Sequence, residues 1–243
     1  MKINCDLGEG LGLWQMGQDE HIMPYIDMAN IACGFHASDP VTIATTLELA
    51  KQHNLTIGAH PSYPDLVGFG RRSMQLSKLE LIKAIQYQVS ALYGMSQIHG
   101  LQMSYVKPHG ALYNDMMKNV EIFENICHAI KEIPHQLTLV IQALPDNQAF
   151  IDLANKYQIS LQFEAFIDRH YQDNGLLVSR TNANASINEL DLIKHRSQQL
   201  KTKGTIQSLN GVELNMKIDT LCIHGDHPLA VEIAKTVRQE LNA

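Results

Sequence analysis

The stretch SYVKPHGALYND, residues 104–115, shows most clearly how this chain is built. A short apolar run ends at Lys107, and the turn that follows carries His109, Asn114 and Asp115. So many polar groups directly after a strand-like run are typical of a binding or catalytic site at the end of a strand. The same arrangement recurs along the chain, so we interpret residues 104–115 as one unit of a repeated design.

Seven short runs of strand-forming residues alternate with helical patterns from one end of the chain to the other. We expect strands at residues 2–6, 27–33, 55–59, 104–107, 137–142, 160–166 and 219–223. Strand and helix in strict alternation predict an α/β fold with parallel strands and crossover helices. A closed barrel and an open doubly wound sheet both satisfy this pattern.

Helix start signals support the alternation. Asp39 followed by Pro40 predicts one helix start, and Ser77 with Glu80 forms a capping box ahead of another. Asp146 precedes a third helical pattern and Pro228 opens the last one. The irregular segment 200–218 we expect to be an extra loop or hairpin before the final strand.

Length and composition describe an ordinary globular chain. The 243 residues, 45% hydrophobic and 18% charged, suit a single barrel domain spanning 1–243. The net charge of -6, with scattered Lys and Arg, argues against nucleic acid or an anionic membrane as the main partner. No apolar run approaches membrane-spanning length, and four cysteines without a C-x-x-C pair fit buried, reduced thiols. We therefore expect a cytoplasmic protein.

Residues able to do chemistry stand at the carboxyl ends of most expected strands. In a parallel barrel these ends share one face, where such enzymes carry their active sites. The residues concerned are Asp6, Glu9, His36, Asp39, His60, Asp65, Lys107, His109, Asn114, Glu164, Asp168, Arg169, His224 and Asp226. A single histidine after a strand is weak evidence, but four at equivalent positions indicate a shared pocket.

The residue types leave two chemistries open. Asp and His ligands on separate strand ends suit a divalent metal that activates water. Lys107, the arginines of the GFGRR loop and the carboxylates would instead suit acid–base chemistry on an anionic substrate without a metal, with or without phosphoryl transfer. Neither a phosphate-binding P-loop nor a G-x-S-x-G serine elbow is present.

Long composite motifs resemble the LamB/YcsF family over nearly the whole chain, from residue 3 to about 235. They are NCDLGEG, ANIACGFHASDP, GAHPSYPDLVGFGRR, VKPHGALYN, FEAFIDRHY with GLLVSR, and IHGDHPLAV. Ser38 stands where the resemblance leads us to expect glycine. The family includes the A subunit of bacterial 5-oxoprolinase.

The resemblance implies a single-domain (β/α)7 barrel similar to the polysaccharide-deacetylase barrels. It also implies ATP-dependent opening of the 5-oxoproline (pyroglutamate) lactam to L-glutamate, together with partner subunits B and C. The catalytic candidates are Asp6, His60, Lys107, His109, Glu164, Asp168, His224 and Asp226. The candidates for binding substrate or phosphate are His36, Asp39, Arg71, Asn114, Arg169 and Arg180.

We hypothesise that Lys107 and Arg71 hold carboxylate or phosphate oxygens. An Asp/His pair among Asp6, His60 and His109 would orient or deprotonate the attacking water. One alternative is a metal-dependent amide or N-acetyl hydrolase that uses Asp6, His60 and His109 as ligands and no ATP. Another is a non-catalytic binding or regulatory subunit.

Overall fold

Seven parallel strands close into a barrel in the computed structural model, which describes all residues 1–243. The barrel strands are β1 (Lys2–Leu7), β2 (Met28–Ala32), β3 (Thr56–His60), β4 (Met103–Val106), β5 (Thr138–Gln142), β6 (Leu161–Phe166) and β9 (Thr220–Ile223). Each strand pairs with the next, and β9 closes the ring between β6 and β1. All seven expected strands are confirmed, and the closed barrel rather than the open sheet is the architecture.

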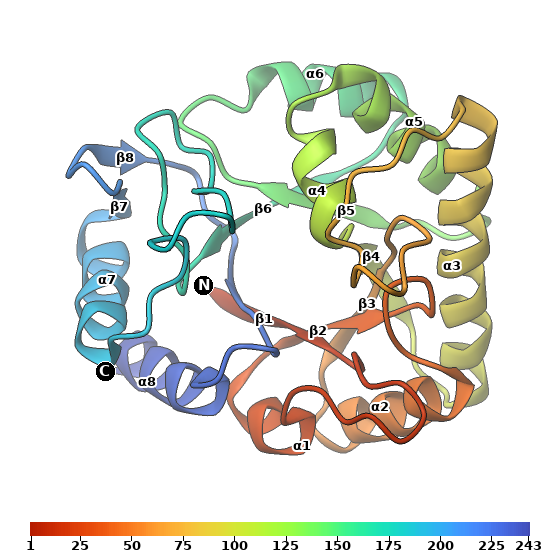
Figure 1. The fold of residues 1–243 in the computed structure, drawn as a ribbon, viewed down its shortest axis with the longest axis horizontal. Helices are drawn as coiled ribbons and strands as arrows, with labels where there is room; N and C mark the ends of the chain where they lie inside the picture. Colours follow the sequence, from red (N-terminus) through yellow and green to blue (C-terminus); the bar gives the residue numbers. More distant parts are fainter.

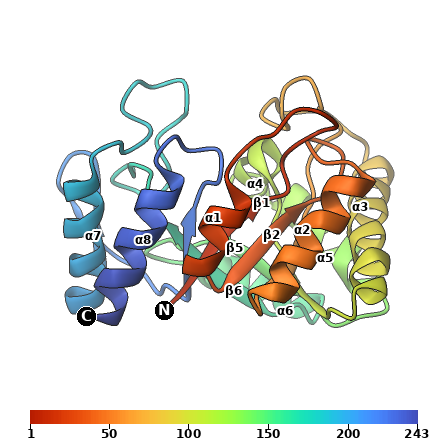
Figure 2. The same ribbon diagram turned by 90° about the horizontal axis from the view of Figure 1, so that it is seen from below.

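Helices form an outer layer around the strands (Figure 1). They are α1 (Asp19–Ile22), the 3-10 turn η1 (Met23–Tyr25), α2 (Pro40–Gln52), α3 (Lys78–Ile98), α4 (Gly110–Met116), α5 (Val120–Lys131), α6 (Gln148–Lys156), α7 (Leu190–Lys203) and α8 (Ala230–Asn242). Long loops gather at one end of the barrel and both termini lie at the other (Figure 2). None of the helices combines the length and the apolar composition needed to cross a membrane.

The predicted helix starts agree with the structure to within two residues. Asp39 caps α2, and the capping box of Ser77 and Glu80 is formed at α3. Helix α8 begins at Ala230 rather than at Pro228, because a turn from His224 to Ala230 precedes it.

The segment 200–218 is only partly the expected hairpin. Strands β7 (Thr205–Gln207) and β8 (Glu213–Asn215) pair antiparallel, which confirms a hairpin before the last barrel strand. Residues 200–203 belong instead to α7, because Leu200 is buried on its inner face. Gly204 ends the helix in the left-handed conformation, with φ of 69°.

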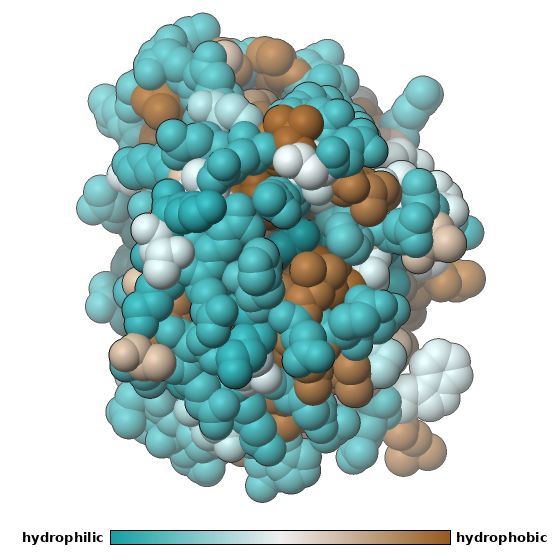
Figure 3. Space-filling model, turned by 90° about the vertical axis from the view of Figure 1, so that its left-hand side faces the viewer, coloured by the Kyte–Doolittle hydropathy of each residue, from teal (hydrophilic) through white to brown (hydrophobic).

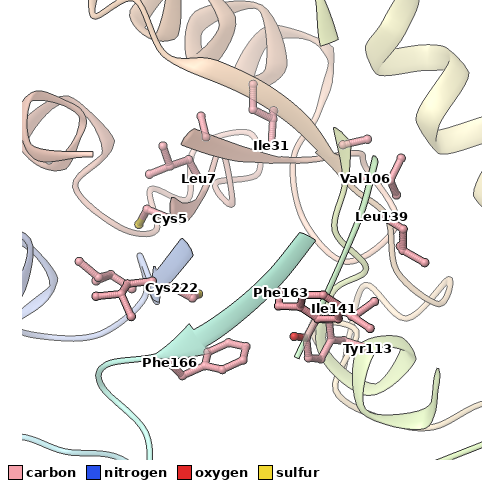
Figure 4. Packing of buried hydrophobic residues seen from close by; sticks show 14 of the residues in the cluster. Cys5, Leu7, Ile31, Val106, Tyr113, Leu139, Ile141, Phe163, Phe166 and Cys222 are labelled. Carbon is pink, nitrogen blue, oxygen red and sulfur yellow. The ribbon is translucent and has the colours of Figure 1, made fainter. Parts of the chain in front are cut away.

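Strand alternation separates an apolar outside from a polar inside. Leu7, Ile31, Val106 and Leu139 point from the ring of strands toward the helices (Figure 4), within a core cluster of 59 buried residues. The alternate positions carry polar groups that contact one another across the barrel. Lys107, directly after β4, for example contacts residues of β1, β6 and β9. The interior of this barrel is therefore unusually polar.

The surface over α7, α8 and the β7–β8 hairpin is mostly hydrophilic, with smaller hydrophobic areas between the polar side chains (Figure 3). The hairpin on this side contacts the loop that follows β6, because Ser208 and Asn210 both donate to the carboxylate of Asp173.

Candidate active site

Lys107 lies at the centre of the barrel's polar interior. It follows β4 directly, is 2% exposed, and its Nζ lies 2.8 Å from Asp6 Oδ1 and 3.1 Å from Glu164 Oε2. Burial by itself lowers the pKa of Lys107, but the two carboxylates and Cys222 outweigh it and raise the pKa well above the ordinary value. Lys107 is therefore charged, and it compensates two buried carboxylates.

Asp6 is held by neutral as well as charged partners. Asn30 donates from Nδ2 to Asp6 Oδ1 at 2.7 Å and to Asn4 Oδ1 at 2.8 Å, and the Tyr105 hydroxyl donates to Asn30 Oδ1 at 2.7 Å. Burial raises the pKa of Asp6, but the neighbouring His60 and Lys107 outweigh it and hold the pKa well below its usual range. Asp6 is thus an ionised carboxylate with a fixed position.

Three histidine rings pack against one another beside this network. The rings of His36 and His109 are parallel at 3.7 Å between centroids, and His60 stands edge-on to both. Glu9 Oε1 lies 3.2 Å from His36 Nε2 and 3.5 Å from His109 Nδ1. These four buried residues place one ligand atom each within 4.8 Å of the others, so they form a cluster that could hold a metal ion.

Gly70 allows the GFGRR loop to close over the histidines. A Cβ at Gly70 would lie 2.8 Å from the His109 ring and 2.9 Å from His36 Cβ, and the φ of 64° favours glycine independently. The carbonyl of the preceding residue, Phe69, accepts from His109 Nε2 at 2.9 Å. The loop therefore orients His109 as well as covering it.

His224 and Asp168 form a separate imidazole–carboxylate pair. Asp168 accepts from the backbone N–H of His224 at 3.0 Å, and its Oδ2 lies 2.9 Å from His224 Nδ1. Burial raises the pKa of Asp168, but the contacts with His224 outweigh it and the pKa falls below the ordinary value. The ionised carboxylate holds the ring by Nδ1 and leaves Nε2 for another partner.

The two adjacent arginines of the GFGRR loop have different surroundings. Arg71 pairs with Asp226 and its guanidinium lies over the Phe69 ring at 4.8 Å. Arg72 pairs with Asp65 within its own loop. Of the two, Arg71 lines the cavity at the carboxyl ends of the strands, and its role in binding a ligand stays a prediction.

A cavity of about 470 Å³ opens at the carboxyl ends of the strands. Ten of the fourteen candidate residues line it: Asp6, His60, Arg71, Lys107, His109, Asn114, Arg169, Arg180, His224 and Asp226. Its volume suits a small polar ligand, and its wall combines cations, carboxylates and imidazoles.

The other four candidates lie behind the cavity wall. Glu164 is fully buried against Lys107, and Asp168 against His224. His36 lies beneath His109. Asp39 accepts from two backbone N–H groups at the start of α2 and from Gly12 N, so the structure gives its carboxylate a capping role. Their contribution to the site remains a prediction.

Sequence reasoning did not select several residues of the network: Asn4, Glu9, Asn30, Tyr105 and Cys222. Asn30 is the only polar residue of β2 and Asn4 lies between the apolar residues Ile3 and Cys5 of β1, and these breaks in the apolar pattern were the available signal. Glu9 was noticed beside Asp6 but not chosen, because nothing local in the sequence shows that it meets His36 and His109.

Comparison with known proteins agrees with these motifs. The LamB/YcsF family matches the chain over residues 1–243. The chain belongs to the LamB/YcsF family. It is 46% identical over 239 residues to the A subunit of 5-oxoprolinase from Vibrio vulnificus strain YJ016, covering 98% of this chain and 96% of that protein.

Other LamB/YcsF relatives give the same result. The 5-oxoprolinase A chain of Bacillus thuringiensis subsp. konkukian is 46% identical over 236 residues, which is 97% of this chain and 92% of the relative. The crystal structure of the lactam utilization protein from Thermus thermophilus superimposes with a TM-score of 0.91 at 37% identity. It covers all of this chain and 96% of that one. The chain therefore shares its barrel fold with a solved protein that is similar to it over its whole length.

Proposed function

We propose that this protein is the A subunit of a 5-oxoprolinase, which opens the lactam of 5-oxoproline to L-glutamate with ATP and partner subunits B and C. The observation that carries the proposal is the polar cavity built from the motifs that this chain shares with its family. Relatives named as the A subunit of 5-oxoprolinase match it over almost its full length. A solved relative is named a lactam utilization protein.

The cavity offers the charges that such a substrate needs. 5-Oxoproline carries one carboxylate and a neutral ring amide, so it needs a cation for binding and a polar group near the amide. Arg71, Arg169 and Arg180 line the cavity wall. Arg169 already donates to the backbone carbonyls of Val178 and Ala185, at 2.6 and 3.1 Å, which fixes its guanidinium. Arg71 and Arg180 are better placed to adjust to a ligand.

Ring opening needs an activated amide and a base. A lactam is a poor electrophile, and transfer of a phosphoryl group from ATP to its oxygen would make that oxygen a good leaving group. Water then adds to the carbon, the ring C–N bond breaks to leave a γ-glutamyl phosphate, and the nitrogen takes up a proton to become the amino group. A second water hydrolyses this acyl phosphate, which releases inorganic phosphate and leaves glutamate. His224, held by Asp168 through Nδ1, is our candidate for the base that accepts the proton of water.

The direct test is glutamate formation from 5-oxoproline, with and without ATP. The purified chain is assayed alone, with subunits B and C, and in extract of source cells that lack only this protein. We expect ATP-dependent glutamate once the partners are present. An extract that stays inactive after the chain is added would contradict the proposed function.

The role of His224 is tested in the same assay. We expect His224→Gln to lower turnover by about 100-fold or more, the usual contribution of an acid–base group. His195→Gln, which removes an exposed histidine from α7, is the matched control. Turnover of His224→Gln within about threefold of the control would show that another group is the base.

A metal-dependent amide hydrolase is the second candidate, favoured by the cluster of Glu9 with three histidines. Glutamate formation without ATP that is lost on chelation would support it over the first proposal. We also propose a cytoplasmic location, because all four cysteines are buried and unpaired, which fits a reducing compartment.

A further inference from the structure

Four buried side chains converge beside the cavity from four different strand ends. Glu9 follows β1, His36 follows β2, His60 ends β3 and His109 follows β4. Each is at most 6% exposed. Residues so far apart in the chain meet only because neighbouring parallel strands end at the same level.

The outward hydrogen bonds of two histidines fix which nitrogens carry hydrogen. His60 Nδ1 lies 2.6 Å from the Lys107 carbonyl, and His109 Nε2 lies 2.9 Å from the Phe69 carbonyl. A carbonyl oxygen only accepts, so both of these nitrogens must donate. The remaining nitrogens, His60 Nε2 and His109 Nδ1, then face each other at 3.0 Å, and in the neutral rings, the form that binds metals, each carries a lone pair.

Glu9 adds a third acceptor to the same space. Its Oε1 lies 3.5 Å from His109 Nδ1 and 3.2 Å from His36 Nε2. Facing lone pairs repel one another in a buried site unless a proton or a cation lies among them. A proton can bridge only one pair of these atoms, whereas a metal ion can contact all four ligand atoms, which lie within 4.8 Å of one another.

The spacing of the acceptor atoms matches a metal site. With Zn–N distances of about 2.0–2.1 Å, two ligands of a tetrahedral zinc lie about 3.3 Å apart. Three of the six pairs of ligand atoms, at 3.0, 3.2 and 3.5 Å, bracket this value, and the other three pairs lie within 4.8 Å. Metal-bound histidines also usually donate their second N–H to a backbone carbonyl or carboxylate, as His60 and His109 do here.

Asp6 is not part of this ligand set. The sequence suggested Asp6 as a metal ligand with His60 and His109, but its Oδ1 accepts from both Lys107 and Asn30. Its Oδ2 lies 3.5 Å from His60 Nε2, which places Asp6 beside the cluster. Glu9 and His36 take the ligand positions that the sequence left undefined.

We propose that Glu9, His36, His60 and His109 bind one divalent transition metal of the zinc type at the cavity wall. Three imidazoles and one carboxylate suit Zn²⁺, whereas Mg²⁺ and Ca²⁺ prefer oxygen ligands. Glu9, His60 and His109 also line the cavity, so the metal would be within reach of a bound ligand. This inference concerns metal binding alone and does not depend on the proposed function.

The test is metal binding by chelator-treated, full-length protein, measured by calorimetry with Zn²⁺ and by the visible absorption of added Co²⁺. We expect one equivalent of Zn²⁺ to bind, and Co²⁺ to give the intense spectrum of a low-coordinate ion with imidazole ligands. The spectrum of free, hydrated Co²⁺ together with no saturable Zn²⁺ binding would overturn the proposal, whatever the enzyme activity.

Variants locate the metal in the chain. Glu9→Gln and His36→Gln should each weaken Zn²⁺ binding by about 100-fold or more, beyond the roughly 10–100-fold typical of an outer-shell partner. His195→Gln on the surface of α7 should bind like wild type. Circular dichroism separates loss of the ligand from loss of the fold. Folded Glu9→Gln and His36→Gln proteins that keep wild-type affinity would show that the metal binds elsewhere, which overturns the site.

Discussion

Ser38 occupies a backbone conformation that glycine adopts more readily. Its φ is 79°, its N–H donates to Gly10 O at 2.8 Å, and its hydroxyl is buried without a partner. The left-handed conformation costs a residue with a Cβ about 1–2 kcal/mol. The unpaired buried hydroxyl adds a further cost in free energy. The family resemblance led us to expect glycine at this position.

Ser38→Gly should therefore raise the free energy of unfolding by about 1 kcal/mol, after the greater chain entropy of glycine is subtracted. Urea unfolding measures the change. Asn54→Gly is the control, because Asn54 also has a positive φ of 54° but asparagine tolerates it better. We expect a smaller gain there. A Ser38→Gly protein less stable than wild type would mean that the serine side chain contributes to the loop.

Asp19 is a half-buried carboxylate that binds the loop after β1. Its Oδ2 accepts from Gly8 N at 2.7 Å. Burial outweighs this hydrogen bond and raises the pKa of Asp19 to about 6, from an ordinary value near 4. The folded protein therefore holds this proton more tightly than the unfolded chain. The contribution of protonated Asp19 to the free energy of unfolding is lost as the pH rises from about 4 to about 6.

Asp19→Asn keeps an acceptor for Gly8 and removes the titration. A shift of two pKa units corresponds to about 3 kcal/mol, and partial exposure reduces this to about 1–2 kcal/mol. We expect the variant to equal wild type near pH 4 and to exceed it in unfolding free energy by that amount at pH 7. Urea titrations at several pH values measure this, and a difference independent of pH would contradict the assignment.

At the scale of elements, β3 and β4 pack closely because Gly58 on β3 has no side chain. A Cβ at Gly58 would lie 2.2–2.4 Å from ring atoms of Tyr105. The register between the two strands also shifts between Ile57 and Gly58. Glycine thus lets the Tyr105 ring lie across β3 and reach Asn30, which in turn holds Asp6.

Gly58→Ala should destabilise the protein by about 1–3 kcal/mol, because the Tyr105 ring has no free space to move into. The comparison variant is Gly94→Ala in α3, where a Cβ meets nothing within 4 Å. There we expect a gain of about 0.5–1 kcal/mol from helix propensity. Thermal and urea unfolding measure both. Equal effects of the two substitutions would show that Tyr105 repacks without cost.

For the whole molecule, the charged interior joins strands that are not neighbours. Lys107 follows β4, while its partners Asp6, Glu164 and Cys222 lie on β1, β6 and β9. These contacts cross the barrel, so they tie opposite walls together. Buried ion pairs add little net stability, but removal of one partner leaves the others uncompensated.

Lys107→Met should therefore lower the unfolding free energy by about 3–5 kcal/mol. The double variant Lys107→Met/Glu164→Gln should be more stable than Lys107→Met alone, because one uncompensated carboxylate is then neutral. Urea unfolding of the wild type, both single variants and the double variant provides the cycle. Additive losses from the two substitutions would mean that Lys107 and Glu164 do not interact.

Much of the fold could be predicted because its signals are local. The seven strands, the cap at Asp39 and the capping box at Ser77 depend on residues close together in the chain, and all were found. Helix α7 and the first residue of α8 were harder to predict from the sequence. The buried face of α7 includes Arg196 and Gln199, so hydrophobic periodicity is weak there.

The candidate site was predicted as a group of residues but not as a set of contacts. The motifs placed ten candidates on one cavity wall, since parallel strands end on the same face. They did not show that Arg72 would pair with Asp65, or that Glu9 would face His36 and His109. Such pairings join residues far apart in sequence, and their geometry follows from strand order and register.

The sequence by itself determined the alternation of strands and helices, the helix caps and the family motifs, because these depend on neighbouring residues and on residue type. The alternation alone left open whether the sheet closes. The family resemblance implied a barrel, and the tertiary structure confirms it, with β9 paired to both β6 and β1. Closure is what brings Lys107 between Asp6 and Glu164 and places Glu9 among three histidines. The charges and lone pairs that define this site interact only over a few ångströms, so their chemistry arises when the barrel closes.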